Sequence, residues 1–470
     1  MRTLFVLLAV STLACAAEPT GLQAGAHAID ITPLKFPISV NGGFADRQAT
    51  KAKDRLHARC IVLTQGGASL VIVTVDSCML PRELVDRAKA LAEKATGITA
   101  KNMLISATHT HTAPTATPVF QSVPDPEYVK FLTEKIAEGI ASAAKNRVPA
   151  EAGWTKIEVP ALLYNRRWKM KPGTINTDPF GGTSDLVKMN PGVQNPNLLE
   201  PAGAVDPELS VLAIRSRTGI PIALHANYSL HYVGDLPMLS ADYFGVFCDA
   251  IGGKIVADPK QSPPFVAALS NGTSGDVNNV DMKSPLPKTA PGERCRTVAD
   301  TLATAGAKAY ASIPFSANVR LGATEEEIEL GVRKPSTKEI ERAEGILGAL
   351  DSRSPKSPAE VYAAETTAMA KYPDTVKLKL QACHIGDLAI TAIPCEVFTE
   401  IGLKLKKESP FKSTFNISLA NGYNGYLPTP EQHKLGGYET WRARSSYLEV
   451  NASEKIVPAV LKLLAKLNAE

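Results

Sequence analysis

Apolar positions along the chain follow two periodicities, one typical of buried strands and the other of amphipathic helices. Short runs rich in β-branched residues predict strands, and segments with apolar residues three or four apart predict helices. The strands are expected at residues 60–63, 69–75, 210–216, 265–269, 376–384 and 388–393. The helices are expected at residues 81–95, 126–146, 293–312, 337–350, 396–406 and 453–467. This alternation predicts an α/β fold with a mixed β-sheet core and helices packed on the outer faces.

One segment interrupts the alternation. Residues 166–207 are rich in Gly, Pro, Asn and Asp and contain few apolar residues. They predict a long irregular loop, of the kind that often covers a functional site. The rest of the sequence contains no linker, internal repeat or low-complexity tract. We therefore expect a single large catalytic domain over residues 18–470.

The first 17 residues have the layout of a cleavable secretory signal. Arg2 precedes a short apolar stretch, and small residues follow up to Ala17. Cleavage after Ala17 predicts a secreted or periplasmic protein, and a lipid anchor at Cys15 is the alternative. No later stretch of sequence reaches the roughly 18 to 20 unbroken apolar residues that a membrane span needs. We therefore expect no transmembrane segment and at most peripheral membrane contact.

The charge of the chain bears on its partners, and the spacing of its cysteines bears on disulfide formation. The chain has 51 Lys and Arg against 47 Asp and Glu, a formal charge of +4, and no dense basic cluster. Nucleic-acid binding is therefore not expected. Six cysteines follow the signal segment at scattered spacings, without a CxxC pair, which favours buried free thiols. They are Cys60, Cys78, Cys248, Cys295, Cys383 and Cys395.

The segment SATHTHTAP at residues 106–114 is the first candidate for chemistry. It follows the apolar run at 103–105, which reads as a buried strand. Side chains two positions apart on an extended backbone point to the same side, so His109 and His111 can reach into one cavity. Such a pair suits a metal ligand with a polar neighbour, although surface loops also contain His-x-His pairs.

Further residues with metal-binding side chains lie at similar places. His231, in NYSLHYVG, follows an apolar run, and Glu396, in AITAIPCEVF, stands where a helix is predicted to begin. Tyr426 and Tyr438 share a loop segment. A zinc site with three His or carboxylate ligands and an open position polarises a carbonyl and lowers the pKa of bound water to about 7, as amide or ester hydrolysis requires. By residue type alone, Glu396 also fits a first-turn helix acid and the tyrosines fit packing aromatics. His225 is more typical of a core histidine.

Together these motifs resemble the neutral and alkaline non-lysosomal ceramidases over nearly the whole chain after residue 17. The matching stretches, in order, are GAHAIDITP, DRLHARCIVL with VTVDSCML, SATHTHTAP, VDPELSVLAI, NYSLHYVG with SADYFG, AIPCEVFTEIG, and the segment 426–438. The resemblance implies hydrolysis of an N-acyl amide bond in N-acylsphingosine or a related lipid amide. It also implies a Zn²⁺ ion, with the ligands His109, His231, Glu396 and Tyr426.

The resemblance implies roles for residues beside the metal as well. His111 would hydrogen-bond the substrate or the developing oxyanion, and Tyr438 would contact the reacting amide. Arg166, in YNRRW, corresponds to a site arginine of the family. Arg167 is the alternative, because the family pattern has one arginine where this chain has two.

Two departures from the family pattern bear on the function. The family has Gly-Asp-x-Ser-Pro-Asn where this chain has GDVNN at 275–279, so Asn278 stands at the position of a site serine. An amide cannot act as the nucleophile or proton relay that a hydroxyl can. The family usually has a C-terminal immunoglobulin-like domain, which we do not expect here, because the sequence stops soon after the helix predicted at 453–467. Two alternatives therefore stay open: an amidase or esterase for a smaller acyl substrate, and a catalytically impaired secreted binding protein of the same fold.

Overall fold

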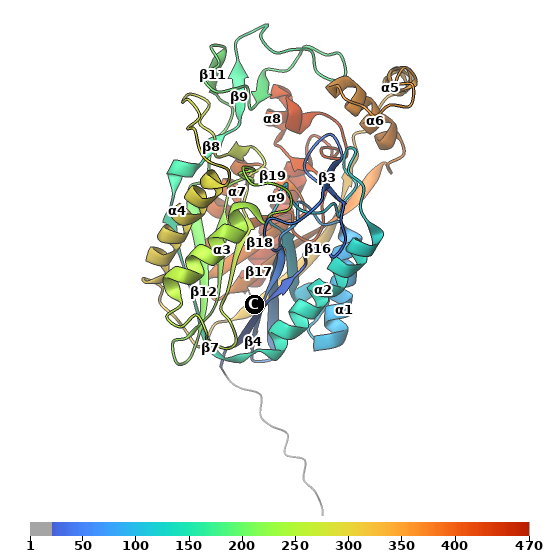
Figure 1. Ribbon diagram of the computed structural model, residues 1–470. Coiled ribbons are helices and arrows are strands. Elements are labelled where there is room, and N and C mark those ends of the chain that lie inside the picture. The colour runs from blue at the N-terminus through green and yellow to red at the C-terminus, as the bar shows by residue number, and fades with distance from the viewer. Residues whose placement is uncertain (1–20, 470) are drawn as a thin grey trace, which may run out of the picture.

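An eight-stranded mixed sheet forms the larger part of the core (Figure 1). The computed structural model describes residues 21–469, so the expected signal segment and Cys15 lie outside the described residues. Neighbouring strands are antiparallel, except for a parallel pair at each edge of the sheet. The strands in order are β14 (Val266–Asn271), β13 (Pro221–Tyr228), β12 (Glu208–Ser216), β7 (Val148–Glu158), β1 (Gln23–Asp30), β4 (His57–Gln65), β5 (Ala68–Val75) and β6 (Met103–Ala107).

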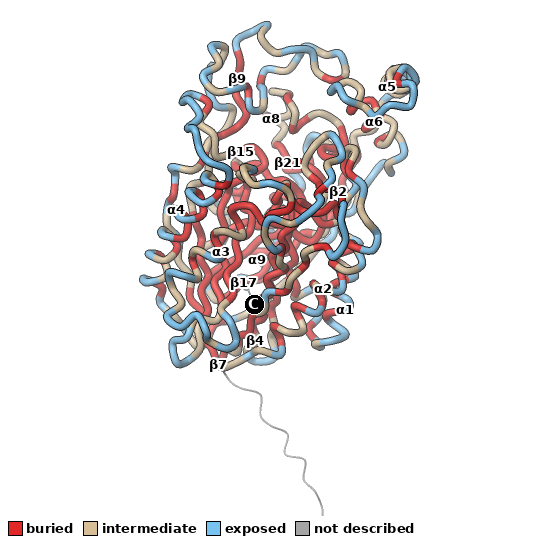
Figure 2. Tube along the Cα trace, in the orientation of Figure 1, coloured by how far each residue is buried: buried red, intermediate tan, exposed pale blue. Residues whose placement is uncertain are grey.

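A second sheet of four strands packs face to face against the first. Its order is β16 (Leu321–Gly331), β17 (Thr375–Ile385), β18 (Leu388–Ile393) and β20 (Ser413–Ser418). Side chains alternate across a strand, so each sheet sends every second residue into the space between them. Ile61, Ile72 and Leu212 of the larger sheet meet Ile390 and Phe415 of the smaller sheet there. Figure 2 shows the buried positions concentrated in these central strands.

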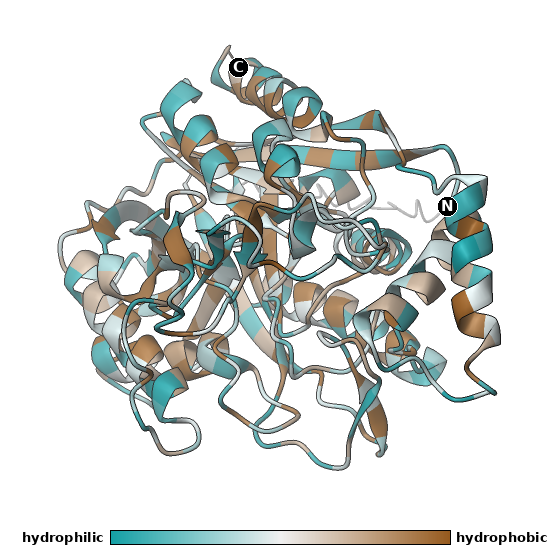
Figure 3. Cartoon of the chain, turned by 90° about the horizontal axis from the view of Figure 1, so that it is seen from above, coloured by the Kyte–Doolittle hydropathy of each residue, from teal (hydrophilic) through white to brown (hydrophobic). Residues whose placement is uncertain are grey.

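Helices cover the outer faces of both sheets and complete four layers. The larger sheet is covered by α1 (Arg82–Thr96), α2 (Pro126–Lys145), α3 (Asp242–Ile255) and α4 (Glu293–Tyr310). The smaller sheet is covered by α7 (Thr399–Glu408) and α9 (Ala452–Ala469). Each helix buries one apolar stripe, as in α2, where Leu132, Ile136 and Ile140 are buried. The mixture of hydrophobic and hydrophilic residues on the outer helices is visible in Figure 3.

The predicted α/β class with a mixed sheet core is confirmed, but the segment 166–207 is not simply an irregular loop. It contains the three-stranded sheet of β9 (Arg167–Met170), β10 (Val187–Met189) and β11 (Leu198–Pro201). Strands of three or four residues are too short to show a periodicity in the sequence, which is why they were not predicted. This small sheet lies at the top of Figure 1, next to α8 (Pro430–Leu435), while α5 (Thr337–Gly348) and α6 (Pro358–Ala370) lie at the other side of the same end of the molecule.

The helix expected at 396–406 begins later than predicted. Glu396 and Val397 form the short strand β19 (Glu396–Val397), which pairs in parallel with β21 (Tyr426–Leu427), and the helix α7 starts at Thr399. The Glu396 N–H donates to the Gly425 carbonyl at 2.9 Å. Glu396 is therefore held by strand pairing and is not a first-turn helix acid.

Two further expectations can be compared with the structure. All six cysteines within residues 21–469 are buried free thiols. In the same part of the chain, no helix combines the length and the apolar character needed to cross a membrane.

Candidate metal centre

The candidate site lies where strands of both sheets end. In the larger sheet, β6 leads to His109 and β13 leads to His231. In the smaller sheet, β18 leads to Glu396, whose strand β19 pairs with the strand that contains Tyr426. Loops that follow the carboxyl ends of strands commonly hold the functional groups of α/β proteins. The two sheets thus bring together residues from four distant parts of the sequence.

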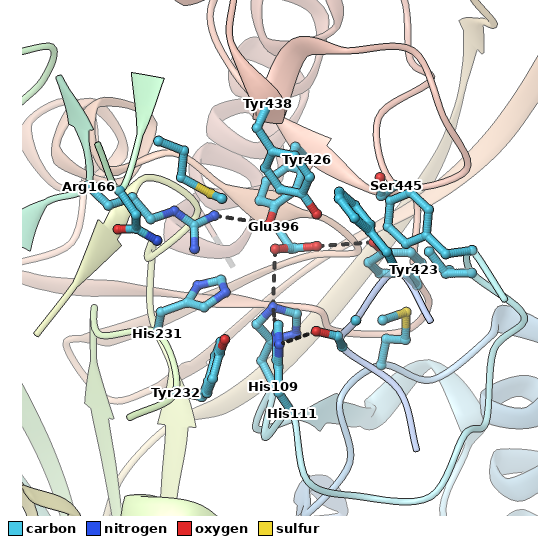
Figure 4. A pocket seen from close by; sticks show the side chains of 18 residues that line it. His109, His111, Arg166, His231, Tyr232, Glu396, Tyr423, Tyr426, Tyr438 and Ser445 are labelled. Atoms are coloured by element: carbon cyan, nitrogen blue, oxygen red, sulfur yellow. Dashed lines mark hydrogen bonds and ion pairs between the residues drawn. The ribbon is translucent and has the colours of Figure 1, made fainter. Parts of the chain in front are cut away.

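Three of the candidate ligands form a tight cluster. One potential ligand atom from each of His109, His231 and Glu396 lies within 4.8 Å of the other two. Nε2 of His109 is 3.1 Å from Oε2 of Glu396, and the ring centres of His109 and His231 are 4.5 Å apart. None of the three residues is more than 4% exposed. Figure 4 shows their side chains pointing toward one another.

The other candidate histidine of the same strand lies elsewhere. His225 is fully buried in β13, where its Nε2 is 3.0 Å from the Ser270 hydroxyl and its ring stacks on Phe415. The structure therefore places His231 in the cluster and His225 in the core between the sheets.

Arg166 connects Tyr426 to the cluster. Its Nη2 donates to the Tyr426 hydroxyl at 3.0 Å and to the Gly275 carbonyl at 2.8 Å. Arg167 points away from the cavity and forms an ion pair of 2.6 Å with Glu439. The same Glu439 carboxylate accepts from Arg166 at 3.1 Å. Of the two neighbouring arginines, Arg166 is thus the one at the site.

Backbone carbonyls orient all three imidazoles of the site. The Nδ1 atoms lie 2.8, 3.0 and 3.1 Å from carbonyl oxygens, which are those of Cys78 for His109, Gly42 for His111 and Ser274 for His231. A carbonyl oxygen only accepts, so each Nδ1 carries the proton and a neutral ring keeps its lone pair on Nε2. Metal-binding histidines are commonly oriented in this way.

The Nε2 atoms of the three histidines and the Glu396 carboxylate converge on one point with too few hydrogen-bond donors between them. Nε2 of His109 is 3.1 Å from Nε2 of His111. Within residues 21–469, the buried Nε2 of His231 has no hydrogen-bond partner, and Oε2 of Glu396 faces Nε2 of His109, which is an acceptor in the neutral ring. Buried acceptors that face each other without a donor are unfavourable. The arrangement therefore fits a cation, and two imidazole nitrogens with a carboxylate oxygen suit zinc.

The electrostatics of the cluster also favour one positive charge at this point. Burial opposes protonation of His109, but the Glu396 carboxylate and Cys78 raise its pKa to about 10. Burial raises the pKa of Glu396, but His109 and Arg166 hold it below the usual value. Burial together with Arg166 and His109 holds the pKa of His231 well below its usual value. A proton or a metal ion between His109 and Glu396 would supply the positive charge.

A cavity of about 250 Å³ opens onto this cluster. His111 and Tyr438 line it, as does Tyr232, whose ring stacks on His111 with ring centres 3.7 Å apart. Tyr423 also lines the cavity, and its hydroxyl donates to Oε1 of Glu396 at 3.0 Å. Tyr232 was not singled out in the sequence although it adjoins His231. Tyr423 stands in a glycine-rich loop without a periodic pattern, so nothing in the sequence indicated its role.

Asn278 is not among the described residues that line this cavity. It lies in β15 (Val277–Asn278), where its Oδ1 accepts from the Val280 N–H at 2.9 Å. Its Nδ2 donates to Oδ1 of Asn190 at 2.6 Å, and Asn190 does line the cavity. The hydrogen bonds of Asn278 direct its side chain toward Asn190, and its expected place among the catalytic groups stays a prediction.

The fold and the site together define a four-layer α/β protein with a candidate metal centre at the ends of its strands. The chain matches no protein-family model. Its sequence is similar to neutral ceramidase B of Dictyostelium discoideum, with 25% identity over 275 residues. That match covers 54% of this chain and 35% of the relative, so the chain matches only about a third of the length of this curated protein.

The fold is that of the neutral ceramidases. The crystal structure of neutral ceramidase from Pseudomonas aeruginosa superposes with a TM-score of 0.70 at 15% identity, covering 96% of this chain and 75% of that one. A ceramidase complexed with C2 superposes with a TM-score of 0.71 at 15% identity, covering 96% and 76%. The resemblance predicted from the motifs is therefore confirmed, in sequence over part of the chain and in fold over most of it.

Proposed function

We propose that the protein is a zinc-dependent amidohydrolase that cleaves an N-acyl amide bond, in N-acylsphingosine or a related lipid amide. The observation that carries this proposal is the convergence of His109, His231 and Glu396 through buried atoms, among which Nε2 of His231 has no hydrogen-bond partner within the described residues. The similarity to neutral ceramidases supports the choice of substrate class.

Zinc would be held by His109, His231 and Glu396, with Tyr426 as the fourth ligand. Burial and Glu396 raise the pKa of Tyr426 well above its usual value, while Arg166 acts in the opposite direction. The phenol therefore loses its proton only when a strong cation beside it lowers this pKa. When bound, the metal would polarise a carbonyl and acidify a water molecule.

The chain's own residues would bind the amide and move protons. Burial and the neighbouring His109 and Arg166 hold the pKa of His111 well below its usual value, so its ring is neutral. Because Nδ1 of His111 faces the Gly42 carbonyl and carries the proton, its Nε2 keeps the lone pair that can accept a proton. Burial raises the pKa of Tyr438, so its hydroxyl remains a donor for the leaving nitrogen. Arg166 fixes Tyr426 and adds positive charge where the carbonyl oxygen becomes negative.

The size of the cavity favours a second candidate, an amidase or esterase for a smaller acyl group. Pockets that enclose drug-sized ligands usually measure about 300–1,000 Å³, and this one measures about 250 Å³. The third alternative, a binding protein without turnover, depended on Asn278 at a nucleophile position. Because Asn278 does not line the cavity, that alternative loses its motivation. We further propose that the protein acts outside the cytoplasm, because residues 1–17 have the layout of a secretory signal.

Hydrolysis of fluorogenic N-acyl amides and esters of different chain length tests the proposal. The zinc-loaded protein should cleave amides, lose activity with a chelator and regain it when zinc is added. His231→Ala should abolish the activity, whereas His433→Ala, in α8 outside the cavity lining, should retain it. Full activity in the chelated protein, or no amide cleavage after zinc loading, would refute the proposal. Faster cleavage of short-chain esters than of any amide would favour the second candidate.

A further inference from the structure

The amide of Asn278 holds the amide of Asn190 at the edge of the cavity. Asn278 ends β15, and Asn190 follows β10 directly, 88 positions earlier in the sequence. The two side chains are joined by a hydrogen bond of 2.6 Å. Only Asn190 lines the cavity, together with Arg166 and His231. The side chain of Asn278 therefore reaches the cavity through Asn190.

The hydrogen bonds fix which end of each amide faces which partner. The Val280 N–H donates to Asn278 at 2.9 Å, so the atom that accepts it must be the Asn278 carbonyl oxygen. The other end of that side chain is then the NH₂ group, which donates to Asn190. The accepting atom of Asn190 must be its carbonyl oxygen, which leaves the Asn190 NH₂ group as the exposed end. Within residues 21–469, no protein atom accepts a hydrogen bond from that group.

The backbone of Asn190 is fixed as well. Its φ of 45° lies in the left-handed region, which asparagine tolerates better than most residues. Its N–H donates to the Arg166 carbonyl at 2.8 Å. Asn190 is thus tied by its backbone to the arginine that contacts Tyr426 and by its side chain to Asn278. Asn190 is exposed at the edge of the cavity, but its backbone N–H and its side-chain carbonyl are both bonded, so its NH₂ group is held in one orientation for recognition.

We infer that Asn190 is a specificity-determining residue that donates a hydrogen bond to a hydroxyl oxygen on the amine half of the substrate, and that Asn278 is the positioning residue that holds it. This inference rests on the proposed function. The loss of one hydrogen bond between neutral groups should change kcat/KM by about three- to tenfold. A substrate without the hydroxyl should be discriminated against by the same factor.

The test uses two fluorogenic N-acyl amides with the same acyl group. One carries a hydroxyl group on a carbon of its amine half, and the other lacks this hydroxyl group. The wild-type enzyme should prefer the hydroxylated probe by about three- to tenfold. Asn190→Ala and Asn278→Ala should each remove this preference through KM, with kcat little changed. The double variant should lose no more than either single variant, because both act through one contact. Asn195→Ala is the matched control, since Asn195 lies in the same segment and bonds the Pro191 carbonyl but does not line the cavity.

Three results would overturn the inference: a preference that survives in either single variant, effects that add in the double variant, or an equal loss in Asn195→Ala. Failure of the proposed function gives a different result, in which the zinc-loaded wild type cleaves neither probe. Fluorescence anisotropy with the uncleaved probes then tests the inference alone. Tighter binding of the hydroxylated probe that is lost in Asn190→Ala would support it, and equal binding of both probes would refute it.

Discussion

Glu439 forms ion pairs with two buried arginines, and the cost of breaking these ion pairs can be predicted. Its carboxylate accepts from Arg166 at 3.1 Å and from Arg167 at 2.6 Å, and Glu439 is fully buried. Glu439→Gln keeps the shape of the side chain but removes the carboxylate that forms ion pairs with both buried guanidinium groups. Breaking a buried ion pair in this way costs about 3–5 kcal/mol. That is a large part of the roughly 5–15 kcal/mol by which a domain is usually stable.

Denaturant unfolding, followed by intrinsic fluorescence, measures the predicted loss. The double variant Glu439→Gln with Arg167→Met should recover more than half of the lost stability, because it removes the guanidinium group that forms the shorter of the two ion pairs with Glu439. It should not recover activity fully, since Arg166 would still lack the carboxylate that orients it toward Tyr426. Glu200→Gln, at the exposed pair with Lys169, should change the free energy of unfolding little. Unfolding of Glu439→Gln at the wild-type midpoint would refute this account of the site.

Four other predictions concern single residues. His109→Ala should lose bound zinc, measured by metal analysis of the purified protein, and retention of zinc would contradict the ligand assignment. Tyr423→Phe should weaken zinc binding by about tenfold or more in a competition assay with a chelator, because Glu396 loses the donor that orients it; an unchanged affinity would count against this. Asn278→Ser should leave kcat for N-acyl amides nearly unchanged, since residue 278 does not line the cavity; a large rise in kcat would restore the serine position to the mechanism. Lys89 is buried without a hydrogen-bond partner, and burial lowers its pKa to about 8, so Lys89→Met should stabilise the fold by about 3 kcal/mol at pH 7. Since the unfolded lysine titrates near 10.5, this gain is full below pH 8 and should disappear as the pH rises to about 10.5; a gain that does not change with pH would refute it.

The elements that the sequence predicted well are those with long, regular patterns. The helix expected at 126–146 is observed as α2, and the strands expected at 69–75 and 388–393 are observed as β5 and β18. Their apolar residues repeat often enough to identify the period. The pairing of two sheets face to face could not be predicted in this way. Alternation within a strand says that one face is buried, but not which distant strand covers it.

The same distinction applies to the site. The motifs supplied His109, His231, Glu396 and Tyr426 as candidates, each following an apolar run or lying in a turn-rich loop. Their convergence depends on the ends of two sheets meeting, which no local pattern contains. Glu439 illustrates the limit, because its partner Arg166 lies 273 positions away in the sequence. A buried carboxylate next to a tyrosine in a loop gives no sign of the arginines that it neutralises.

Asn278 shows why a position in a motif does not by itself define a role. Its place in the motif at 275–279 aligned it with a serine of the family, and the change from hydroxyl to amide suggested a loss of catalysis. In the structure the side chain has two partners that lie close in space, the Val280 N–H and the side-chain carbonyl of Asn190. The first requires an acceptor and the second requires a donor, and an amide supplies both. The residue is therefore suited to holding the segment that carries Asn190 against the cavity. Asparagine in place of serine at position 278 is therefore better explained by its hydrogen bond to Asn190 at the edge of the cavity than by the loss of a reacting group. The kinetics of Asn278→Ala and Asn278→Ser separate these two explanations.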